Sequence, residues 1–304
     1  MSRWNGVSVV GSAPRVLTAA IVALTLAGCA ADTQERATVV VGAGENVTGV
    51  VLAHIYAGAV RSAGVTVAVK EDLGERSDYL AALDGGEVSL VPDFTGELLH
   101  TFDSLSGATE AEDVFVDLNR SLPEGLSVGD YALAEDRVAI AVSPSGPFAV
   151  ASSLSDFAPS CSDAVVGIVE NSNDASAGTE PLDIGMRLGP VYGCSFTEFM
   201  VYPDSDSAVS GLDSGEIDAL ALRTASFGPL AAGLSALDDD ESAFAAQNVV
   251  PLMRDGALDD AAFAALSVVA GELTTADLAE MIGEVRSGEN SGDVAARWLG
   301  EHNL

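Results

Sequence analysis

Short apolar runs that alternate with helix-like segments are the feature that most constrains how this chain can fold. Residues 38–42 (TVVVG) form a β-branched run typical of a buried parallel strand, and residues 50–63 carry apolar side chains at helical spacing before Gly64. The alternation continues along residues 65–69 (strand), 78–83 (helix) and 88–91 (strand). This order of elements predicts an α/β unit built on a mainly parallel sheet flanked by helices.

A second unit of the same kind follows. Its strand candidates are residues 137–143 (RVAIAVS), 164–169 (AVVGIV) and 218–222 (DALAL). The heptapeptides at 83–89 (LDGGEVS) and 212–218 (LDSGEID) resemble each other, and each places Gly where a helix ends and a strand begins. We therefore expect two α/β lobes.

The remaining chain suggests how the lobes are divided. Residues 137–143 lead into the second lobe, and residues 248–252 (NVVPL) are interpreted as the return crossing. Helices are expected at 259–272, at 276–286 after the capping residues Thr274 and Thr275, and at 293–301. If these helices pack on the first lobe, lobe 1 comprises 38–137 plus 248–304 and lobe 2 comprises 138–247, joined by two hinge strands.

The first 28 residues have the features of an export signal. Arg3 and Arg15 precede the apolar run at 16–28, which at about 13 residues is short for a membrane span and has the length of a signal-peptide core. The run ends in Leu-Ala-Gly-Cys, which resembles a bacterial lipobox. That resemblance implies cleavage before Cys29 and a diacylglycerol on its sulfur, with residues 29–37 as a tether on the extracytoplasmic face of the cell membrane. An ordinary signal peptide with a chance cysteine is the alternative.

The charge is strongly negative. The chain has 46 acidic residues against 13 Lys and Arg, a formal net charge of −33, and Lys70 is its only lysine. Such a surface repels phosphate groups, which argues against nucleic-acid binding. Most of these carboxylates are expected to form a solvated surface.

Besides Cys29, the chain has two cysteines, Cys161 and Cys194. An isolated pair in an exported protein is expected to form a disulfide, which closes a loop of about 30 residues and contributes roughly 3–4 kcal/mol. Two buried free thiols are the alternative. No histidine is near either cysteine in the sequence, so no metal site is expected there.

Catalytic and cofactor motifs give no support for an enzyme. Gly42 and Gly44 follow a strand, but Val47 stands where a dinucleotide-binding fingerprint requires a third glycine. His54, His100 and His302 are dispersed. The chain is therefore expected to need no cofactor and to catalyse no reaction.

Several stretches together carry a resemblance to one family. They are residues 41–53, the loop Asp93-Phe94-Thr95-Gly96, Leu122-Pro123 with Asp136, Tyr192-Gly193-Cys194, and the tail from Pro251. This chain resembles, over about residues 38–304, the osmoprotectant-binding proteins of ABC importers, which bind glycine betaine, carnitine or choline. The resemblance implies the two-lobed type II periplasmic-binding-protein fold, in which the hinge closes over a ligand held in an aromatic cage by cation–π attraction.

The resemblance also implies candidate ligand-binding residues. Phe94 takes the place of a cage tyrosine, and Asp136 that of an acid near the ligand. The further candidates are Asp93, Thr95, Asn46, Arg223 and Thr224. The alternatives are that Phe94 is a core residue and that Asp93 and Asp136 only cap helices. Tyr131 and Tyr192 are further cage candidates, although Tyr192 is expected to pack beside Cys194.

Departures from the family pattern bear on the ligand. Gly44 stands where many relatives have Lys, Thr48-Gly49 where they have Glu-Gln, and Val138 where some have an aromatic residue. Glu97 replaces the second Thr of the loop, and it could equally be a solvated acid of the first helical turn. These changes favour a cation without a carboxylate, such as choline, whereas Arg223 could supply a partner for a carboxylate.

The sequence thus predicts a solute-binding lipoprotein of an ABC importer. It would capture a small quaternary-ammonium solute of the choline or glycine betaine type and deliver it to permease subunits that work with a cytosolic ATPase. A membrane-anchored sensor or scaffold with the same fold and no transport role is the alternative.

Overall fold

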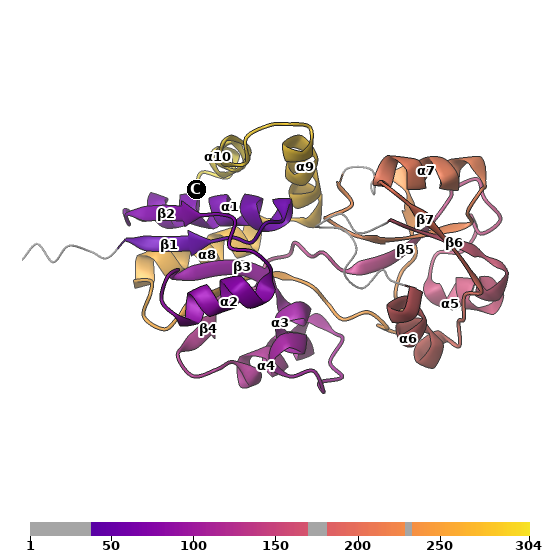
Figure 1. Cartoon of the computed structure of the whole chain (residues 1–304), viewed down its shortest axis with the longest axis horizontal. Helices are drawn as coiled ribbons and strands as arrows, with labels where there is room; N and C mark the ends of the chain where they lie inside the picture. The colour runs from indigo at the N-terminus through magenta and orange to yellow at the C-terminus, as the bar shows by residue number, and fades with distance from the viewer. Residues whose placement is uncertain (1–37, 170–180, 229–232) are drawn as a thin grey trace, which may run out of the picture. The chain divides into compact units, whose positions relative to one another are not determined.

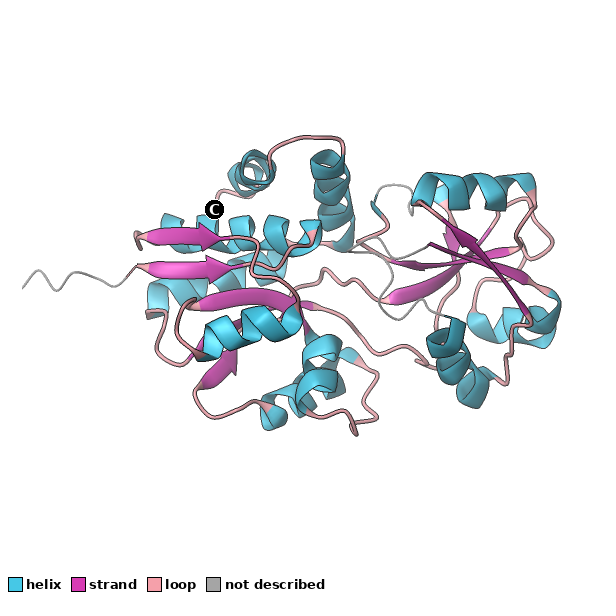
Figure 2. Cartoon of the chain, viewed as in Figure 1, coloured by secondary structure: helices cyan, strands magenta, loops and turns pink. Residues whose placement is uncertain are grey.

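The computed structural model describes residues 38–169, 181–228 and 233–304. The expected leader, Cys29 and the tether lie outside the described residues. The described chain contains two five-stranded sheets with helices on their faces (Figures 1 and 2).

The first sheet has the strand order β2-β1-β3-β10-β4. Its strands are β1 (Val39–Gly42), β2 (Val67–Lys70), β3 (Leu90–Phe94), β4 (Leu126–Val128) and β10 (Val249–Arg254). β1 pairs in parallel with β2 and β3, whereas β10 runs antiparallel between β3 and β4. The helices that accompany this part of the chain are α1 (Val47–Ser62), α2 (Arg76–Asp84), α3 (Thr95–Phe102) and α4 (Ala111–Ser121).

The second sheet has the strand order β7-β6-β8-β5-β9. Its strands are β5 (Val138–Val142), β6 (Val165–Val169), β7 (Glu198–Tyr202), β8 (Ala219–Arg223) and β9 (Ser235–Ala236). β6 pairs in parallel with β7 and β8, whereas β5 is antiparallel to β8 and β9. Its helices are α5 (Leu154–Phe157), the 3₁₀ helix η1 (Ala158–Asp163), α6 (Pro181–Tyr192) and α7 (Ser205–Ser214).

The expected fold class, two α/β units that each carry a sheet flanked by helices, is confirmed. Each sheet is mixed, since four of its five strands run in one direction and the fifth, β10 or β5, runs against its two neighbours. The antiparallel pairings belong to β5 and β10, the strands that follow the two crossings. A strand that enters a sheet directly from another sheet, without a helical crossover, is free to pair antiparallel.

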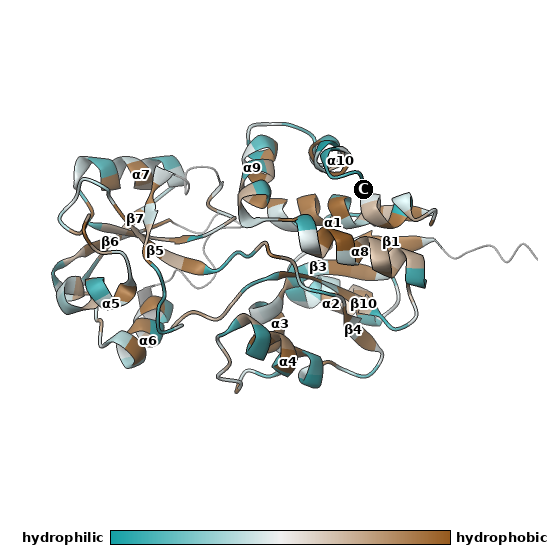
Figure 3. Cartoon of the chain, turned by 180° about the vertical axis from the view of Figure 1, so that it is seen from behind, coloured by the Kyte–Doolittle hydropathy of each residue, from teal (hydrophilic) through white to brown (hydrophobic). Residues whose placement is uncertain are grey.

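The three C-terminal helices pack on α1. They are α8 (Asp260–Glu272), α9 (Thr275–Arg286) and α10 (Ser291–Glu301), drawn in yellow beside the indigo α1 in Figure 1. α1 is hydrophobic on most sides (Figure 3), and Val51, Leu52 and Ile55 are at most 1% exposed. Residues of β1 and α1 therefore share one hydrophobic core with residues of the three C-terminal helices.

The repeated heptapeptide forms the same structure twice. A glycine with positive φ follows the end of each helix, Gly86 (75°) two residues after the end of α2 and Gly215 (74°) directly after the end of α7. The next amide reaches back to the helix at the same distance in both, since Glu87 donates to the Ala82 carbonyl at 2.9 Å and Glu216 to the Gly211 carbonyl at 2.9 Å. Left-handed backbone favours glycine, which explains why both copies keep it at this position.

The residues expected as crossings, 137–143 and 248–252, form most of β5 and β10 in different sheets, and the segments that lie side by side are those just before these strands. The Ala132 amide donates to the Val249 carbonyl at 2.7 Å, and the Val249 amide donates to the Ala134 carbonyl at 2.9 Å. Further along, the Asp136 amide donates to the Gln247 carbonyl at 2.9 Å. The outward and return segments are thus hydrogen-bonded to each other where the chain passes between the sheets.

Sequence patterning did not assign β4, β7 or α6. β7 is an edge strand whose residues are mostly exposed or half-buried, and β4 has only three residues, so neither forms a distinct apolar run.

Among the described residues, no single helix is long and apolar enough to cross a membrane. Only α8 and α9 taken together have the necessary length and composition, and a bend of 95° separates them.

Candidate ligand-binding site

The junction between β3 and α3 is built around a close backbone approach. α3 begins at Thr95, directly after Phe94 ends β3. A Cβ at Gly96 would lie 2.6 Å from the Ala246 carbonyl oxygen, so only glycine lets the first turn of α3 sit against the return segment. Thr95 is 1% exposed and accepts a hydrogen bond from the Asn248 amide at 3.1 Å. Thr95 and Gly96 therefore fix the position of the loop rather than contact solvent.

Asp93 is held by a cation and a phenol. The Arg76 side chain donates to both carboxylate oxygens at 3.1 and 3.0 Å, and the Tyr79 hydroxyl donates at 2.7 Å. Burial opposes the charge of Arg76, but Asp93 and Glu97 outweigh it and raise the pKa of Arg76. Burial, reinforced by Asp93, raises the pKa of Tyr79. A buried carboxylate with these partners is satisfied without a ligand.

Arg76 and Tyr79 were missed by the sequence analysis. The one indication in the sequence was Asp93, an acid at the end of an apolar strand. A buried carboxylate of this kind requires a cationic partner. The chain has only 13 Lys and Arg to supply one, but nothing in the spacing selects Arg76 from among them.

Asp136 is 1% exposed and organises the turn after β8. It accepts hydrogen bonds from the amides of Ala225 and Ser226, both at 2.8 Å, from the Ser226 hydroxyl, and from Arg223 Nε at 3.1 Å. The Ser226 hydroxyl also lies 3.3 Å from that of Thr48 at the start of α1. Asp136 therefore links the crossing segment, the end of β8 and α1.

Arg223, the last residue of β8, approaches the β3–α3 junction. Besides Asp136, its Nη1 lies 3.6 Å from Glu97 Oε1, and its Cζ lies 5.9 Å from the centroid of the Phe94 ring. The latter distance is within the range of a cation–π contact. The predicted residues Phe94, Glu97, Asp136 and Arg223 are thus brought together from three separate segments.

Glu97 and Phe94 are the members of this group with exposed surface. The Glu97 side chain is 22% exposed, accepts from Arg76 Nη1 at 3.0 Å, and belongs to the first turn of α3. Phe94 is half-buried, with its ring packed against the hydrophobic core that includes Val51 and Leu52 of α1. A molecule that approaches this place meets an aromatic ring and a carboxylate.

Asn46 and Thr224 have backbone partners. Asn46 is the N-cap of α1, and its side chain accepts from the Gly49 amide. The Thr224 hydroxyl donates to the Glu135 carbonyl at 3.1 Å and accepts from the Arg137 amide at 3.1 Å. These contacts attach Thr224 to the crossing segment.

The two tyrosines have their contacts elsewhere. Tyr131 packs edge-on against Phe115, with 4.9 Å between ring centroids. The Tyr192 hydroxyl donates to Asp239 at 2.7 Å. Its ring packs against the hydrophobic core beside the second sheet, which includes Cys194. The structure therefore places neither ring in contact with Phe94.

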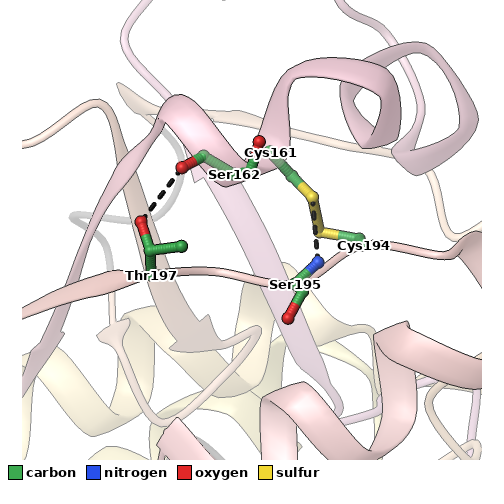
Figure 4. Close-up of a disulfide and its surroundings, with 5 residues drawn as sticks. All are labelled: Cys161, Ser162, Cys194, Ser195 and Thr197. Atoms are coloured by element: carbon green, nitrogen blue, oxygen red, sulfur yellow. Dashed lines mark hydrogen bonds between the residues drawn. A yellow bond between two sulfur atoms is a disulfide. The ribbon is translucent and has the colours of Figure 1, made fainter.

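Cys161 and Cys194 form a disulfide (Figure 4). The Ser195 amide donates to Cys161 Sγ at 3.2 Å, and the Thr197 hydroxyl donates to the Ser162 carbonyl at 3.0 Å. These contacts attach η1 to the segment that leads into β7. An open depression of about 660 Å³ beside the disulfide is lined by residues that include Tyr192, Ser195 and Glu241, and Tyr192 is the one cage candidate among its lining residues.

Within the three described ranges, no group of three or more His, Cys, Asp and Glu side chains is arranged to hold an ion.

Comparison with known proteins gives a match over nearly the whole chain. A family model described as the substrate-binding domain of the ABC-type glycine betaine transport system matches residues 37–301. One similar solved structure, of a glycine betaine/carnitine/choline ABC transporter, has a TM-score of 0.75 at 14% identity and covers 87% of this chain and 98% of that one. Apo YehZ from Escherichia coli has a TM-score of 0.71 at 19% identity, covering 87% and 98%.

A ligand-bound protein is also similar. An ABC-transporter choline-binding protein in complex with choline has a TM-score of 0.53 at 14% identity and covers 88% of this chain and 90% of that one. At these identities the structural matches show a shared fold. The family assignment comes from the family model.

Proposed function

The chain belongs to the family of substrate-binding domains of ABC-type glycine betaine transport systems, and we propose that it captures a quaternary-ammonium compatible solute of the choline or glycine betaine type. It then delivers the solute to permease subunits that work with a cytosolic ATPase. The observation that carries the proposal is the family match over residues 37–301, which includes the β3–α3 junction where Phe94 lies.

Phe94 is the proposed contact for the ligand cation. A half-buried aromatic ring at the start of a helix offers a face to a quaternary ammonium, and each such contact is worth roughly 0.5–2 kcal/mol. Arg223 already lies over this ring. The ligand would therefore use the uncovered face or displace the guanidinium when it binds.

Charge supports a cationic ligand. Arg76 and Arg223 are surrounded by Asp93, Glu97 and Asp136, so negative charges outnumber positive ones among these five side chains. A positive ligand beside Glu97 would be attracted, and the acidic surface of the whole chain would concentrate cations near it.

The proposed mechanism is closure of two lobes over the solute. We assign lobe 1 to residues 38–137 plus 248–304 and lobe 2 to residues 138–247. The paired crossing segments, which include the bridge between Glu135 and Asn248, are the proposed hinge. Changes in a few backbone dihedrals at such segments are enough for hinge closure.

The proposed location is the extracytoplasmic face of the cell membrane, with acyl chains on Cys29 as the anchor. Cys29→Ser removes the acceptor sulfur, so the protein should leave the membrane fraction and lose incorporation of labelled fatty acid. An unchanged distribution in both assays would contradict the anchor while leaving the binding function in place.

Calorimetry tests the binding function. Residues 30–304 contain both sheets and every described core, and they are titrated with choline, glycine betaine, carnitine and proline betaine. We expect micromolar binding of at least one, about −8 kcal/mol. Phe94→Ala should weaken binding at least tenfold. Phe263→Ala, at an exposed ring on α8, is the matched control and should not.

Two outcomes would count against the proposal. Binding of none of the four solutes would remove the ligand class. Equal losses for Phe94→Ala and Phe263→Ala would remove Phe94 from the site. Uptake of the bound solute by cells, lost on deletion of the chain, separates a transport role from sensing.

A further inference from the structure

Glu97 lies between two guanidinium groups that come from different parts of the chain. Its Oε2 accepts from Arg76 Nη1 at 3.0 Å, and its Oε1 lies 3.6 Å from Arg223 Nη1. Arg76 begins α2, whereas Arg223 ends β8. One carboxylate therefore joins two arginines that could otherwise serve as partners for an anionic group.

Each arginine also has a buried aspartate. Arg76 binds both oxygens of Asp93, whose side chain is 1% exposed, and Arg223 Nε binds Asp136, whose side chain is 2% exposed. We call these five side chains, Arg76, Asp93, Glu97, Asp136 and Arg223, the charge cluster. Two positive charges against three negative ones leave it with an excess of one negative charge.

Glu97 is the only one of the three acids in the charge cluster whose carboxylate is partly exposed to solvent. Its side chain is 22% exposed, whereas those of Asp93 and Asp136 are almost fully covered. It lies three residues after Phe94, in the first turn of α3. Asp93 is adjacent to Phe94 in the sequence, but its side chain is 1% exposed, so a solute held at the Phe94 ring would meet the Glu97 carboxylate instead.

We infer, on the basis of the proposed function, that Glu97 is a specificity-determining residue that excludes solutes with a carboxylate. A carboxylate beside Glu97 would add a fourth negative charge to a partly desolvated cluster in which both arginines already have acidic partners. A quaternary ammonium that ends in a hydroxyl adds only its positive charge. The cluster thus selects choline-class solutes over betaines.

The test compares two ligands that share a trimethylammonium group. The dissociation constants of choline and glycine betaine are measured calorimetrically for residues 30–304 and for Glu97→Gln, which keeps the shape and removes the charge. The wild type should prefer choline at least tenfold. In Glu97→Gln, glycine betaine should bind about tenfold more tightly and choline no more tightly, which changes the ratio by about 1.4 kcal/mol.

A second variant and a control make the result specific. Glu97→Thr also removes the charge and should shift the ratio in the same direction. Glu198→Gln, at an exposed acid on the edge strand β7, makes the same change in net charge and should leave the ratio unchanged. Thermal unfolding of each variant confirms that it is folded.

The outcomes separate this inference from the proposed function. If the wild type binds both ligands and neither Glu97 variant changes their ratio, the inference is overturned and the function stands. An equal shift in Glu198→Gln also overturns it, because a general charge effect then explains the result. If the wild type binds carnitine or proline betaine but neither choline nor glycine betaine, the inference fails and the proposed function stands. If it binds none of the four solutes, both fail.

Discussion

The guanidinium carbon of Arg223 lies 5.9 Å from the centroid of the Phe94 ring, so a residue at the end of β8 covers the aromatic side chain that ends β3. The same arginine binds Asp136, which in turn holds the turn that contacts α1. Arg223 is therefore the side chain through which the candidate ligand-binding residues are connected.

Removal of the Arg223 charge should destabilise the protein strongly. Arg223→Met keeps the bulk of the side chain but leaves Asp136 buried without its cation, and loss of one partner of a buried pair costs about 3–5 kcal/mol. Urea unfolding at neutral pH measures the change. Arg120→Met is the control, because Arg120 is 73% exposed and its pair with Asp117 contributes about 1 kcal/mol or less. Similar losses for both variants would contradict the assigned role.

Gly96 should not tolerate a methyl group. In Gly96→Ala the new Cβ would lie 2.6 Å from the Ala246 oxygen, so α3 must shift at a cost of about 1–3 kcal/mol. Gly107→Ala has no atom within 4 Å of its new Cβ and should change stability by roughly 0.5 kcal/mol or less. Chemical denaturation of both variants makes the comparison. A tolerated Gly96→Ala would show that the return segment does not constrain the loop.

Glu135 should make stability depend on pH. Burial raises the pKa of Glu135 despite its ion pair with Arg137, and Asp136 adds to the rise. As the pH rises from about 4, the ordinary glutamate range, the unfolded chain loses this proton before the folded protein does, so folding becomes less favourable. Glu135→Gln should thus match the wild type near pH 4 and be more stable than it at pH 7. Melting curves across this range test the prediction, and a constant difference would contradict it.

Reduction of the disulfide should destabilise the second sheet and its helices. The bond joins cysteines 33 residues apart, and closure of such a loop contributes roughly 3–4 kcal/mol in the chain-entropy model. Denaturation with and without a reductant measures the loss, and the double variant Cys161→Ser/Cys194→Ser should reproduce it without responding to the reductant. A wild-type protein that is insensitive to reduction would contradict this expectation.

Salt should stabilise the fold. With 46 acidic residues and 13 Lys and Arg, the folded state carries strong self-repulsion. The screening length falls from about 10 Å at 0.1 M salt to about 3 Å at 1 M, which weakens this repulsion. The melting temperature should therefore rise between 0.1 and 1 M NaCl. A flat or falling curve would mean that salt-sensitive ion pairs outweigh the repulsion.

Patterns that depend on neighbouring residues were readable from the sequence. The heptapeptides around Gly86 and Gly215 predicted equivalent helix-to-strand turns, and both glycines have the positive φ that such turns favour. Apolar runs located β1, β5, β6 and β8 to within about two residues of their observed bounds. Strand-helix alternation also predicted the α/β class.

Tertiary structure alone decided which polar side chains meet. The sequence singled out Asp93 and Asp136, but their partners Arg76 and Arg223 are 17 and 87 residues away along the chain. Contacts over such separations depend on strand order and on how the return segment passes beside β3, and no local pattern encodes these. The sequence by itself therefore determined the elements and their class, because backbone preferences and burial periodicity are local. The fold decided that Glu97 lies between two arginines, because that contact forms only when distant elements pack together.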